Sequence, residues 1–523
     1  MVWLALLAAA QVWIADESEK VRPFQTPPAA ASAPRIRLTA AGGECAGAQI
    51  VVRGPARELK AVATSWLDLY RVATITVTHP SGPDGAIGEW PDALIPARDA
   101  LYGEERRAFP VDVEAGRAQA IFVETCVPRG AAAGRVAGAV KVSWHGGGLE
   151  VPVELRRRGF DLPATPALAT AFGFSGYSAA KGHARGPEAN RELTRAYDRI
   201  ALRRGITLFG GTQDAPPMRN GRIDWTAYDE EVSPFIDRWT AVELREPAGL
   251  SRAERRSYRQ QWVEHFRQRG WLDRLFRYVV DEPAEKDFPL VEEKAREYRE
   301  DAPEVRRLVT TRPSPRLPSV DLFAPVLNFG PTPHMWWYQS CMSHGCEPGG
   351  AGSAGDGQSP KGGALEADAS FRGWPSYMID APATAARAMG TLAFTNEISG
   401  ELYFDTVYAY DSMDPWTTQW AFGGNGDGTL YYPGTPARIG GKHDVPVESL
   451  RIVQISRGLA DHAYLSLCAQ LGDPALARAE ARAVAPGLRT WSRDPRTYAQ
   501  MREHLAARIE TLLSARKLGS RLR

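Results

Sequence analysis

The hydrophobic positions of the chain change their period near residue 160. Between residues 35 and 160, short apolar runs such as AQIVVRG, AQAIFVETC and LEVPVEL alternate with turns rich in Gly, Pro and Asp. Several such runs with frequent turn signals predict strands of an antiparallel β-sandwich. The segment FDLPATPAL then marks a boundary, because its prolines interrupt regular structure.

After this boundary, strand-like runs alternate with amphipathic helical segments. Runs such as TAFGFSGY, ITLFGG and VRRLVTT predict strands, whereas NRELTRAYDRIALRRG and SRAERRSYRQQWVEHFRQRG predict helices that end at glycines. This alternation is typical of βαβ units. We therefore predict a (β/α)8 TIM-like barrel over residues 165–470, with residues 471–523 forming C-terminal helices packed on it. An open doubly wound sheet is the alternative, but no GxGxxG motif follows a strand.

The fold class expected is thus multidomain: an N-terminal antiparallel β-sandwich over residues 35–160, followed by an α/β barrel. Of the 523 residues, 44% are hydrophobic and 24% are charged, and the net charge is +1. These values exclude a mainly disordered chain. The balanced charge also argues against a nucleic-acid binder and against a polybasic membrane-surface protein.

Residues 1–15 are apolar but too short to span a bilayer as a helix. We predict a signal peptide there, a linker over residues 16–34, and export to the periplasm, cell envelope or medium. A first buried segment is the alternative, because no Lys or Arg precedes the apolar run. No transmembrane segment is expected elsewhere.

The five cysteines are too few for a disulfide scaffold. In an exported protein, Cys45–Cys126 and Cys341–Cys346 are candidate pairs, although the sequence does not fix the connectivity. His344 lies inside the second pair, but the spacing fits no zinc motif. We expect neither a metal nor a cofactor. The Gly-rich residues 347–363 are either a disordered insertion or a lid over the barrel.

The strongest chemical signal is LFRYVVDEP, in which an apolar run ends in two carboxylates, Asp281 and Glu282. In a barrel, the carboxyl ends of the strands carry the active site. Pro283 is expected to stop the strand and hold Glu282 extended. Neighbouring side chains on a regular strand face opposite sides, so both can serve one pocket only if the strand end is irregular. Otherwise one carboxylate caps the next helix and the other meets solvent.

Adjacent carboxylates suit a division of labour in which the nucleophile belongs to the substrate. The 2-acetamido oxygen of an N-acetylhexosamine can attack its own anomeric carbon. The enzyme then supplies one acid/base and one carboxylate that stabilises the acetamido group. The acid must stay protonated near neutral pH, and a second negative charge beside it raises its pKa.

Aromatic and polar residues follow along the chain in a pattern typical of sugar clefts, where rings stack on pyranose faces and carboxylates bind hydroxyls. The candidate substrate-binding residues are Trp336, Trp337, Tyr338, Tyr403, Trp416 and Asp427. The alternative is ordinary core and turn packing.

Together, RYVVDEP, WWYQSC, GWPSYMID, GELYFDTVYAY, DPW, GDGTLYYPG and VESLRIVQISRGLADHAYL resemble glycoside hydrolase family 123 and the related domain family DUF4091. The resemblance covers roughly residues 165–470 and lies in the order of the motifs. It implies a β-sandwich before a (β/α)8 barrel, with Asp281 stabilising the acetamido group and Glu282 as the acid/base. It also implies exo-β-N-acetylgalactosaminidase activity with a substrate-assisted retaining mechanism.

The expected function is therefore an exo-acting β-N-acetylhexosaminidase, and its expected partner is a glycan with a terminal N-acetylhexosamine. Two alternatives stay open. The first is another retaining glycosidase, with Glu282 as the acid and a nucleophile such as Asp405 from a different strand. The second is a catalytically inactive glycan-binding surface protein. The oligomeric state does not follow from the sequence.

Overall fold

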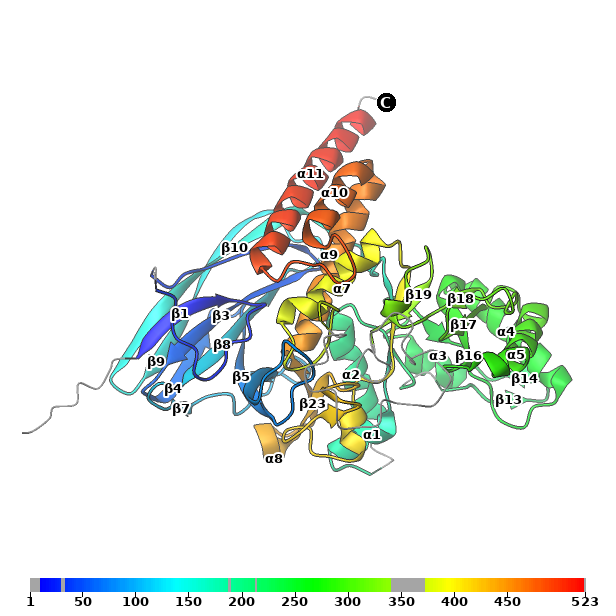
Figure 1. Ribbon diagram of the computed structural model, residues 1–523, viewed down its shortest axis with the longest axis horizontal. Coiled ribbons are helices and arrows are strands. Elements are labelled where there is room, and N and C mark those ends of the chain that lie inside the picture. Colours follow the sequence, from blue (N-terminus) through cyan, green and yellow to red (C-terminus); the bar gives the residue numbers. More distant parts are fainter. Residues whose placement is uncertain (1–9, 30–32, 187–189, 212–213, 340–371, 522–523) are drawn as a thin grey trace, which may run out of the picture.

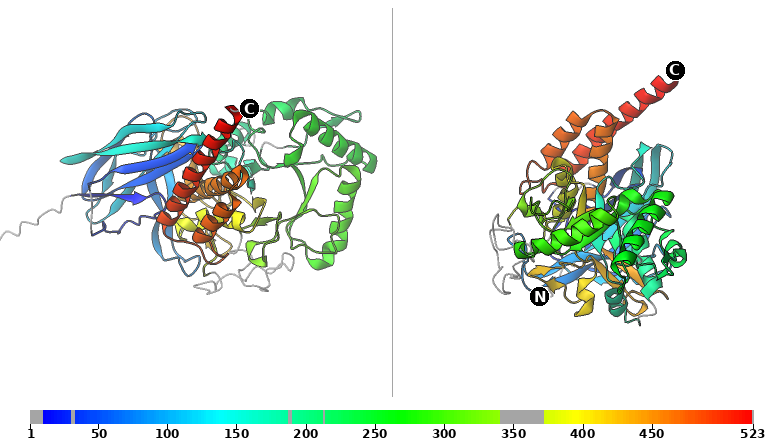
Figure 2. Two further views of the ribbon diagram at one scale, coloured as in Figure 1. Left: turned by 90° about the horizontal axis from the view of Figure 1, so that it is seen from above. Right: turned by 90° about the vertical axis from the view of Figure 1, so that its right-hand side faces the viewer.

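The computed structural model describes residues 10–29, 33–186, 190–211, 214–339 and 372–521. A β-sandwich forms one end of the molecule, and parallel strands with flanking helices form the other (Figure 1). Three C-terminal helices lie over the junction between the two ends (Figures 1 and 2). They are α9 (Leu450–Leu471), α10 (Pro474–Val484) and α11 (Pro495–Arg521). No helix in the described ranges is both long and apolar enough to cross a membrane.

The first sandwich sheet has seven antiparallel strands and draws on both ends of the sequence. In spatial order these are β1 (Gln11–Asp16), β3 (Cys45–Arg53), β8 (Ala118–Cys126), β5 (Asp68–Val77), β6 (Gly88–Pro96), β24 (Val445–Ser449) and β23 (Tyr431–Gly434). The last two strands come from the region that the sequence assigns to the barrel. They join through β24, where Glu448 and Ser449 pair with Leu94 and Ala93 of β6.

The second sandwich sheet has five strands, and the core lies between the two sheets. In spatial order they are β2 (Ile36–Gly42), β10 (Gly147–Asp161), β9 (Gly134–Trp144), β4 (Ala56–Ala63) and β7 (Val111–Val113). Along β10, Val151, Val153 and Leu155 are buried, whereas the residues between them are more exposed. This period-two pattern gives the strand one face for the core and one for solvent. The N-terminal region is thus β-rich and antiparallel as the sequence predicts, except that β2 and β10 pair in parallel.

Residues 10–29 are anchored to this sandwich, whereas the sequence suggests a signal peptide up to residue 15 and then a linker. Strand β1 pairs with β3 along its whole length, and its Trp13 is buried. Glu17 follows the strand and forms a buried ion pair with Arg457 of α9. The residues after β1 are therefore part of the packed structure because their charge and backbone have partners there.

The other end of the molecule has eight parallel strands in two four-stranded sheets. The first sheet has the order β12 (Leu208–Phe209), β11 (Ala169–Gly173), β20 (Gly400–Tyr403), β19 (Trp336–Tyr338). The second has the order β15 (Val242–Glu243), β16 (Leu275–Val280), β17 (Arg306–Val309), β18 (Leu322–Phe323). Two short hairpins accompany them: β13 (Met218–Arg219) with β14 (Arg222–Ile223), and β21 (Trp420–Ala421) with β22 (Gly424–Asn425).

The two parallel sheets share one apolar cluster, although the backbones of the described strands do not form a closed ring. Every one of the eight strands, or the residue beside it, contributes a side chain to this inner cluster, which includes Ala171, Phe209, Ala241, Phe276, Leu308, Leu322, Trp336 and Leu402. Between β12 and β15, side-chain hydroxyls replace the ladder, since the Thr240 N–H binds Thr207 Oγ1 at 2.8 Å. Between β18 and β19 there is a single bridge, Val326 to Tyr338.

Helices follow several of the parallel strands along the chain, but not all of them. The helices before α9 in the described residues are α1 (Gly176–Gly182), α2 (Asn190–Arg203), α3 (Thr226–Val232), α4 (Arg252–Arg269), α5 (Phe288–Asp301), α7 (Ala383–Thr395) and α8 (Pro436–Ile439), of which α8 lies between the sandwich strands β23 and β24. Helix α4 begins at a capping box of Ser251 and Glu254 and ends at Gly270 in the left-handed conformation, as its sequence predicts. Residues 310–321, between β17 and β18, contain no helix. The regular (β/α)8 alternation is therefore incomplete in the described residues.

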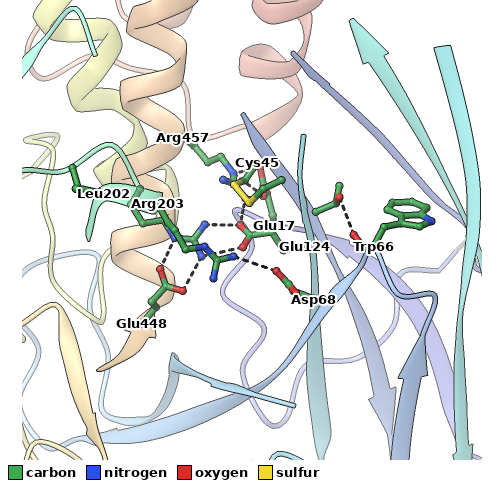
Figure 3. The surroundings of a disulfide bond; sticks show 12 residues. Glu17, Cys45, Trp66, Asp68, Glu124, Leu202, Arg203, Glu448 and Arg457 are labelled. Carbon is green, nitrogen blue, oxygen red and sulfur yellow. Dashed lines mark hydrogen bonds and ion pairs between the residues drawn. A yellow bond between two sulfur atoms is a disulfide. The ribbon is translucent and has the colours of Figure 1, made fainter. Parts of the chain in front are cut away.

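A buried ionic network joins the sandwich to the helices. Glu124 of β8 accepts hydrogen bonds from Arg204, which follows α2, at 2.7 Å and from Arg457 of α9 at 2.7 Å. Arg204 also pairs with Glu448 of β24. Figure 3 shows Glu17, Glu124, Glu448 and Arg457 converging beside Cys45. Because each charge has an opposite partner, the junction can be buried without unpaired ions.

A disulfide fastens two neighbouring strands of the sandwich. Cys45 and Cys126 are directly opposite each other on the antiparallel strands β3 and β8 and are bonded (Figure 3). This candidate pair is confirmed. Cys468 is a buried free thiol. Cys341, His344, Cys346 and residues 347–363 lie outside the described residues.

Candidate functional site

The two adjacent carboxylates follow an irregular strand end. Strand β16 pairs with β17 so that Tyr278 is opposite Leu308 and Val280 is opposite Val309, which leaves one extra residue in β16. Such a bulge bends a strand and redirects the side chains after it. Glu282 then has a φ of +39°, in the left-handed region that residues with a side chain rarely adopt. The extended shape expected for Glu282 before Pro283 is therefore wrong.

Hydroxyl groups from two strands hold Asp281. The Tyr278 hydroxyl donates to Asp281 Oδ1 at 2.5 Å, and the Thr310 hydroxyl donates to the same oxygen at 3.1 Å. The Thr310 oxygen in turn accepts the backbone N–H of Glu282 at 2.6 Å. One buried threonine, just beyond β17, thus fixes both the carboxylate of Asp281 and the backbone of Glu282.

Glu282 is held by a third strand. The Tyr338 hydroxyl, at the end of β19, donates to Glu282 Oε1 at 2.8 Å. Burial raises the pKa of Tyr338 well above its usual value, and the nearby negative charge of Glu282 raises it further. Burial and the charge of Asp281 have the same effect on the pKa of Tyr278. Both phenols therefore stay protonated and act as hydrogen-bond donors to the carboxylates.

Asp281 remains exposed and Glu282 is half-buried, so both can meet a ligand from solvent. The pair, its two tyrosines and Thr310 lie at the carboxyl ends of β16, β17 and β19. In this arrangement hydroxyl groups hold both carboxylates: those of Tyr278 and Thr310 bind Asp281, and that of Tyr338 binds Glu282. It can transfer a proton and stabilise a developing positive charge.

Two further carboxyl groups lie on or after β20, beside β19. Asp405 follows the strand, and burial raises its pKa to about 7 although the N–H groups of Val407 and Thr406 lower it. Glu401 is fully buried within the strand, where burial raises its pKa to about 7 and a hydrogen bond from Tyr377 lowers it. Both carboxyl groups therefore change charge near neutral pH.

The predicted aromatic residues Trp336 and Trp337 are core residues of β19. Together with Tyr338 they form this three-residue strand. Both indoles are completely buried, Trp336 in the inner cluster and Trp337 in the core shared with α7 and α9. Neither exposes a ring face to solvent. Tyr338, next along the strand, is the member of the trio that reaches Glu282.

The other predicted binding residues form two separate groups. Tyr403 is buried and donates to Asp427 Oδ1 at 3.3 Å, while its oxygen accepts the N–H of Gly428 at 2.9 Å. Trp416 packs on Tyr432 of β23, with ring centroids 4.9 Å apart, and donates to the carbonyl of Pro433 at 3.0 Å. Trp416 thus contacts the strand that extends the sandwich.

Tyr278 and Thr310 are site residues that the sequence reasoning missed. Tyr278 lies three residues before Asp281 in the same motif, so period-two alternation with a bulge could have suggested it. Thr310 has no local signal, because its contact with Glu282 arises from the pairing of β16 with β17. In the described part of the chain, no group of three or more His, Cys, Asp or Glu side chains could hold a metal ion.

No protein-family model and no curated protein sequence matches the chain. Among solved structures, it is similar to a family 123 glycoside hydrolase from Clostridium perfringens, which is described in terms of glycolipid glycan hydrolysis. The alignment covers 98% of this chain and 100% of that one, with a TM-score of 0.63 and 10% sequence identity. The resemblance to family 123 expected from the motifs is thus confirmed at the level of the fold.

Two other solved structures align much less well. A β-glucuronidase from Parabacteroides merdae aligns over 80% of this chain and 49% of its own length, with 8% identity and a TM-score of 0.27. A xylanase with a bacterial Ig-like domain from termite gut aligns over 82% of this chain and 99% of its own, with 8% identity and a TM-score of 0.24. These scores are too low to support an argument.

Proposed function

We propose that the protein is a glycoside hydrolase that removes terminal β-N-acetylhexosamine residues, with N-acetylgalactosamine the first candidate sugar. The single observation that carries this proposal is the Asp281–Glu282 pair, held by hydroxyl groups at the carboxyl ends of parallel strands. The fold shared with a family 123 glycoside hydrolase supports the same assignment.

In the proposed first step, Glu282 donates its proton to the glycosidic oxygen as the bond to the anomeric carbon breaks. The acetamido oxygen of the same sugar attacks that carbon and forms a cyclic oxazolinium ion, while the aglycone leaves as an alcohol. The carboxylate of Asp281 accepts a hydrogen bond from the acetamido N–H and stabilises its positive charge. The hydrogen bonds from Tyr278 and Thr310 support this role, because they orient the carboxylate.

In the second step, Glu282 takes a proton from a water molecule that attacks the anomeric carbon. The oxazolinium ring opens, the acetamido group is restored, and the sugar leaves with its β configuration retained. Glu282 ends protonated, ready for the next cycle. Its hydrogen bond from Tyr338 supports this assignment, since it orients the carboxyl group.

We also propose that the eight parallel strands act as one barrel that carries this site at its mouth. The inner cluster to which all eight contribute supports this view. A crystal structure in which β12 and β15, or β18 and β19, lie far apart would contradict the barrel proposal. In this proposal the hydrogen-bonded pair Tyr403 and Asp427 supports the residues at the barrel mouth. Trp416 belongs to the contact between the barrel and the sandwich.

Export is part of the proposal. The Cys45–Cys126 disulfide supports it, because such bonds persist in oxidising compartments outside the cytosol. Fractionation of producing cells tests this point: recovery of the protein only from the cytosol, with both thiols reduced, would contradict export.

The catalytic proposal is tested with aryl β-N-acetylgalactosaminide and β-N-acetylglucosaminide. We expect Glu282→Gln and Asp281→Asn each to lower kcat roughly 10²- to 10⁴-fold, the usual size of a general acid or charge-stabilising contribution. The matched control is Asp405→Asn, which removes the nucleophile required by the alternative mechanism and should leave most of the activity. Collapse of activity in that control, with turnover of sugars that lack a 2-acetamido group, would favour the alternative.

A further inference from the structure

Two short hairpins in this chain have the same turn geometry but different sequences. In the β13–β14 hairpin, Arg219 pairs with Arg222, and the turn residues Asn220 and Gly221 have φ of +51° and +76°. In the β21–β22 hairpin, Ala421 pairs with Gly424, and the turn residues Phe422 and Gly423 have φ of +51° and +84°. Both are two-residue turns with positive φ at both positions.

Asn-Gly is the preferred sequence for such turns, because asparagine tolerates the left-handed conformation. Phenylalanine does not, since its Cβ is crowded by the backbone there. The first hairpin therefore has the residue that its backbone favours, and the second has one that its backbone disfavours. A backbone argument does not account for Phe422, so its side chain must.

The ring of Phe422 belongs to a cluster of three aromatic rings. Its centroid lies 5.1 Å from that of Tyr408 and 5.7 Å from that of Phe404, and the last two are 5.8 Å apart. Phe422 is 40% exposed and Tyr408 is 36% exposed. Gly428 makes room for the cluster, because a Cβ at that position would lie 2.4 Å from Phe404 Cζ. The cluster thus presents aromatic surface to solvent instead of burying it.

This cluster begins just after β20. Leu402 of β20 is paired with Tyr338 of β19, whose hydroxyl binds Glu282. Phe404 lies two residues beyond Leu402, where β20 has ended, and packs against the core that contains Tyr403 and Trp337. The cluster is thus linked to the carboxylate pair through the neighbouring strands β20 and β19.

We propose that Phe422, Tyr408 and Phe404 form an aromatic platform that stacks on the apolar face of a pyranose ring of the substrate. This inference rests on the proposed function and adds a binding surface to it. Exposed rings suit the C–H face of a sugar. The unfavourable turn residue is then retained for binding, in keeping with backbone strain that gathers at functional sites.

The test exchanges the two turn residues. Phe422→Asn removes the ring but gives the turn its preferred residue, so Tm should be unchanged or higher. Its matched control, Asn220→Phe, places the ring on the other hairpin and should lower Tm without changing binding. Binding of methyl β-N-acetylgalactosaminide is measured by NMR titration, and KM with the aryl glycoside. We expect Kd and KM to rise about 5- to 10-fold in Phe422→Asn, the size of an aromatic stacking contribution.

A second variant, Phe422→Trp, keeps a ring and should bind within about twofold of wild type, given the comparable stacking surface. A folded Phe422→Asn protein with unchanged Kd and KM would overturn the platform while leaving the hydrolase assignment intact. Conversely, a wild-type protein that binds the methyl glycoside through Phe422 but cleaves no glycoside would support the platform and overturn the hydrolase. Absence of both binding and cleavage in the wild type would overturn both.

Discussion

Thr310 shows how one residue can fix the geometry of two neighbouring carboxylates. Its oxygen accepts the N–H of Glu282 and its hydroxyl donates to Asp281. The φ of +39° at Glu282 is costly, so an anchor for this backbone is needed. Thr310 acts through the two carboxylates and is a positioning residue.

We therefore expect Thr310→Ala to lower kcat about 10-fold with little change in KM, because substrate contacts remain while the orientation of the carboxylates is lost. The loss of the partner of a partly buried N–H should also reduce the free energy of unfolding, by about 1 kcal/mol. Thr310→Ser keeps the oxygen and should restore most of the activity. Equal kcat for wild type and Thr310→Ala, measured on the aryl glycoside, would contradict a positioning role for Thr310.

The sequence indicates the carboxylate pair but not the conformation that makes it usable. LFRYVVDEP predicts a strand that ends in Asp281 and Glu282, and that is where they lie. The bulge and the left-handed Glu282 depend on the pairing of β16 with β17, which no local pattern encodes. For the same reason the local sequence does not reveal Thr310. It also does not distinguish exposed aromatic residues from buried ones, so Trp336 and Trp337 resemble cleft residues in the sequence although both are buried.

At the scale of elements, helices and long strands follow their local sequence closely. Helix α4 has the capping box and terminal glycine that its sequence predicts. Very short strands are less predictable, since β18 and β19 have two and three residues and carry too little pattern for period two. The sequence does not predict that β23 and β24 belong to the sandwich, because their place beside β6 depends on pairing with a distant segment.

The two short hairpins differ in how well their local sequence predicts the turn. The sequence NG between β13 and β14 predicts its turn, whereas FG between β21 and β22 does not. When a turn residue adopts a backbone conformation that its type disfavours, the contacts of its side chain must compensate. For Phe422 that reason is the exposed aromatic cluster.

At the scale of the whole molecule, a buried ionic network fastens the sandwich to the helices. Burial alone would raise the pKa of Glu124, but Arg204 and Arg457 outweigh it and hold that pKa at about 2. The ordinary pKa of a glutamate is 4.5. A carboxyl with a depressed folded-state pKa contributes stability above its unfolded pKa. That contribution is lost as the pH falls from about 4.5 to 2.

Glu124→Gln should therefore lower the free energy of unfolding at pH 7 by about 3–5 kcal/mol, since it leaves buried arginines short of a partner. The difference from wild type should shrink as the pH falls through 4.5 towards 2. Denaturant unfolding across this range measures it. Glu154→Gln is the control, because its ion pair with Arg135 is on the surface and should contribute less than about 1 kcal/mol. A pH-independent difference for Glu124→Gln would contradict the proposed role of its charge.

The central claim is that the acetamido oxygen of the substrate is the nucleophile, assisted by Asp281. It is tested most directly with aryl β-N-acetylgalactosaminides whose acetyl group carries zero, one, two or three fluorine atoms. Fluorine withdraws electrons and weakens the carbonyl oxygen as a nucleophile. We predict that kcat/KM of the wild-type protein falls steeply and continuously along the series. A rate that is independent of fluorine substitution would contradict the account, because the nucleophile would then have to come from the protein.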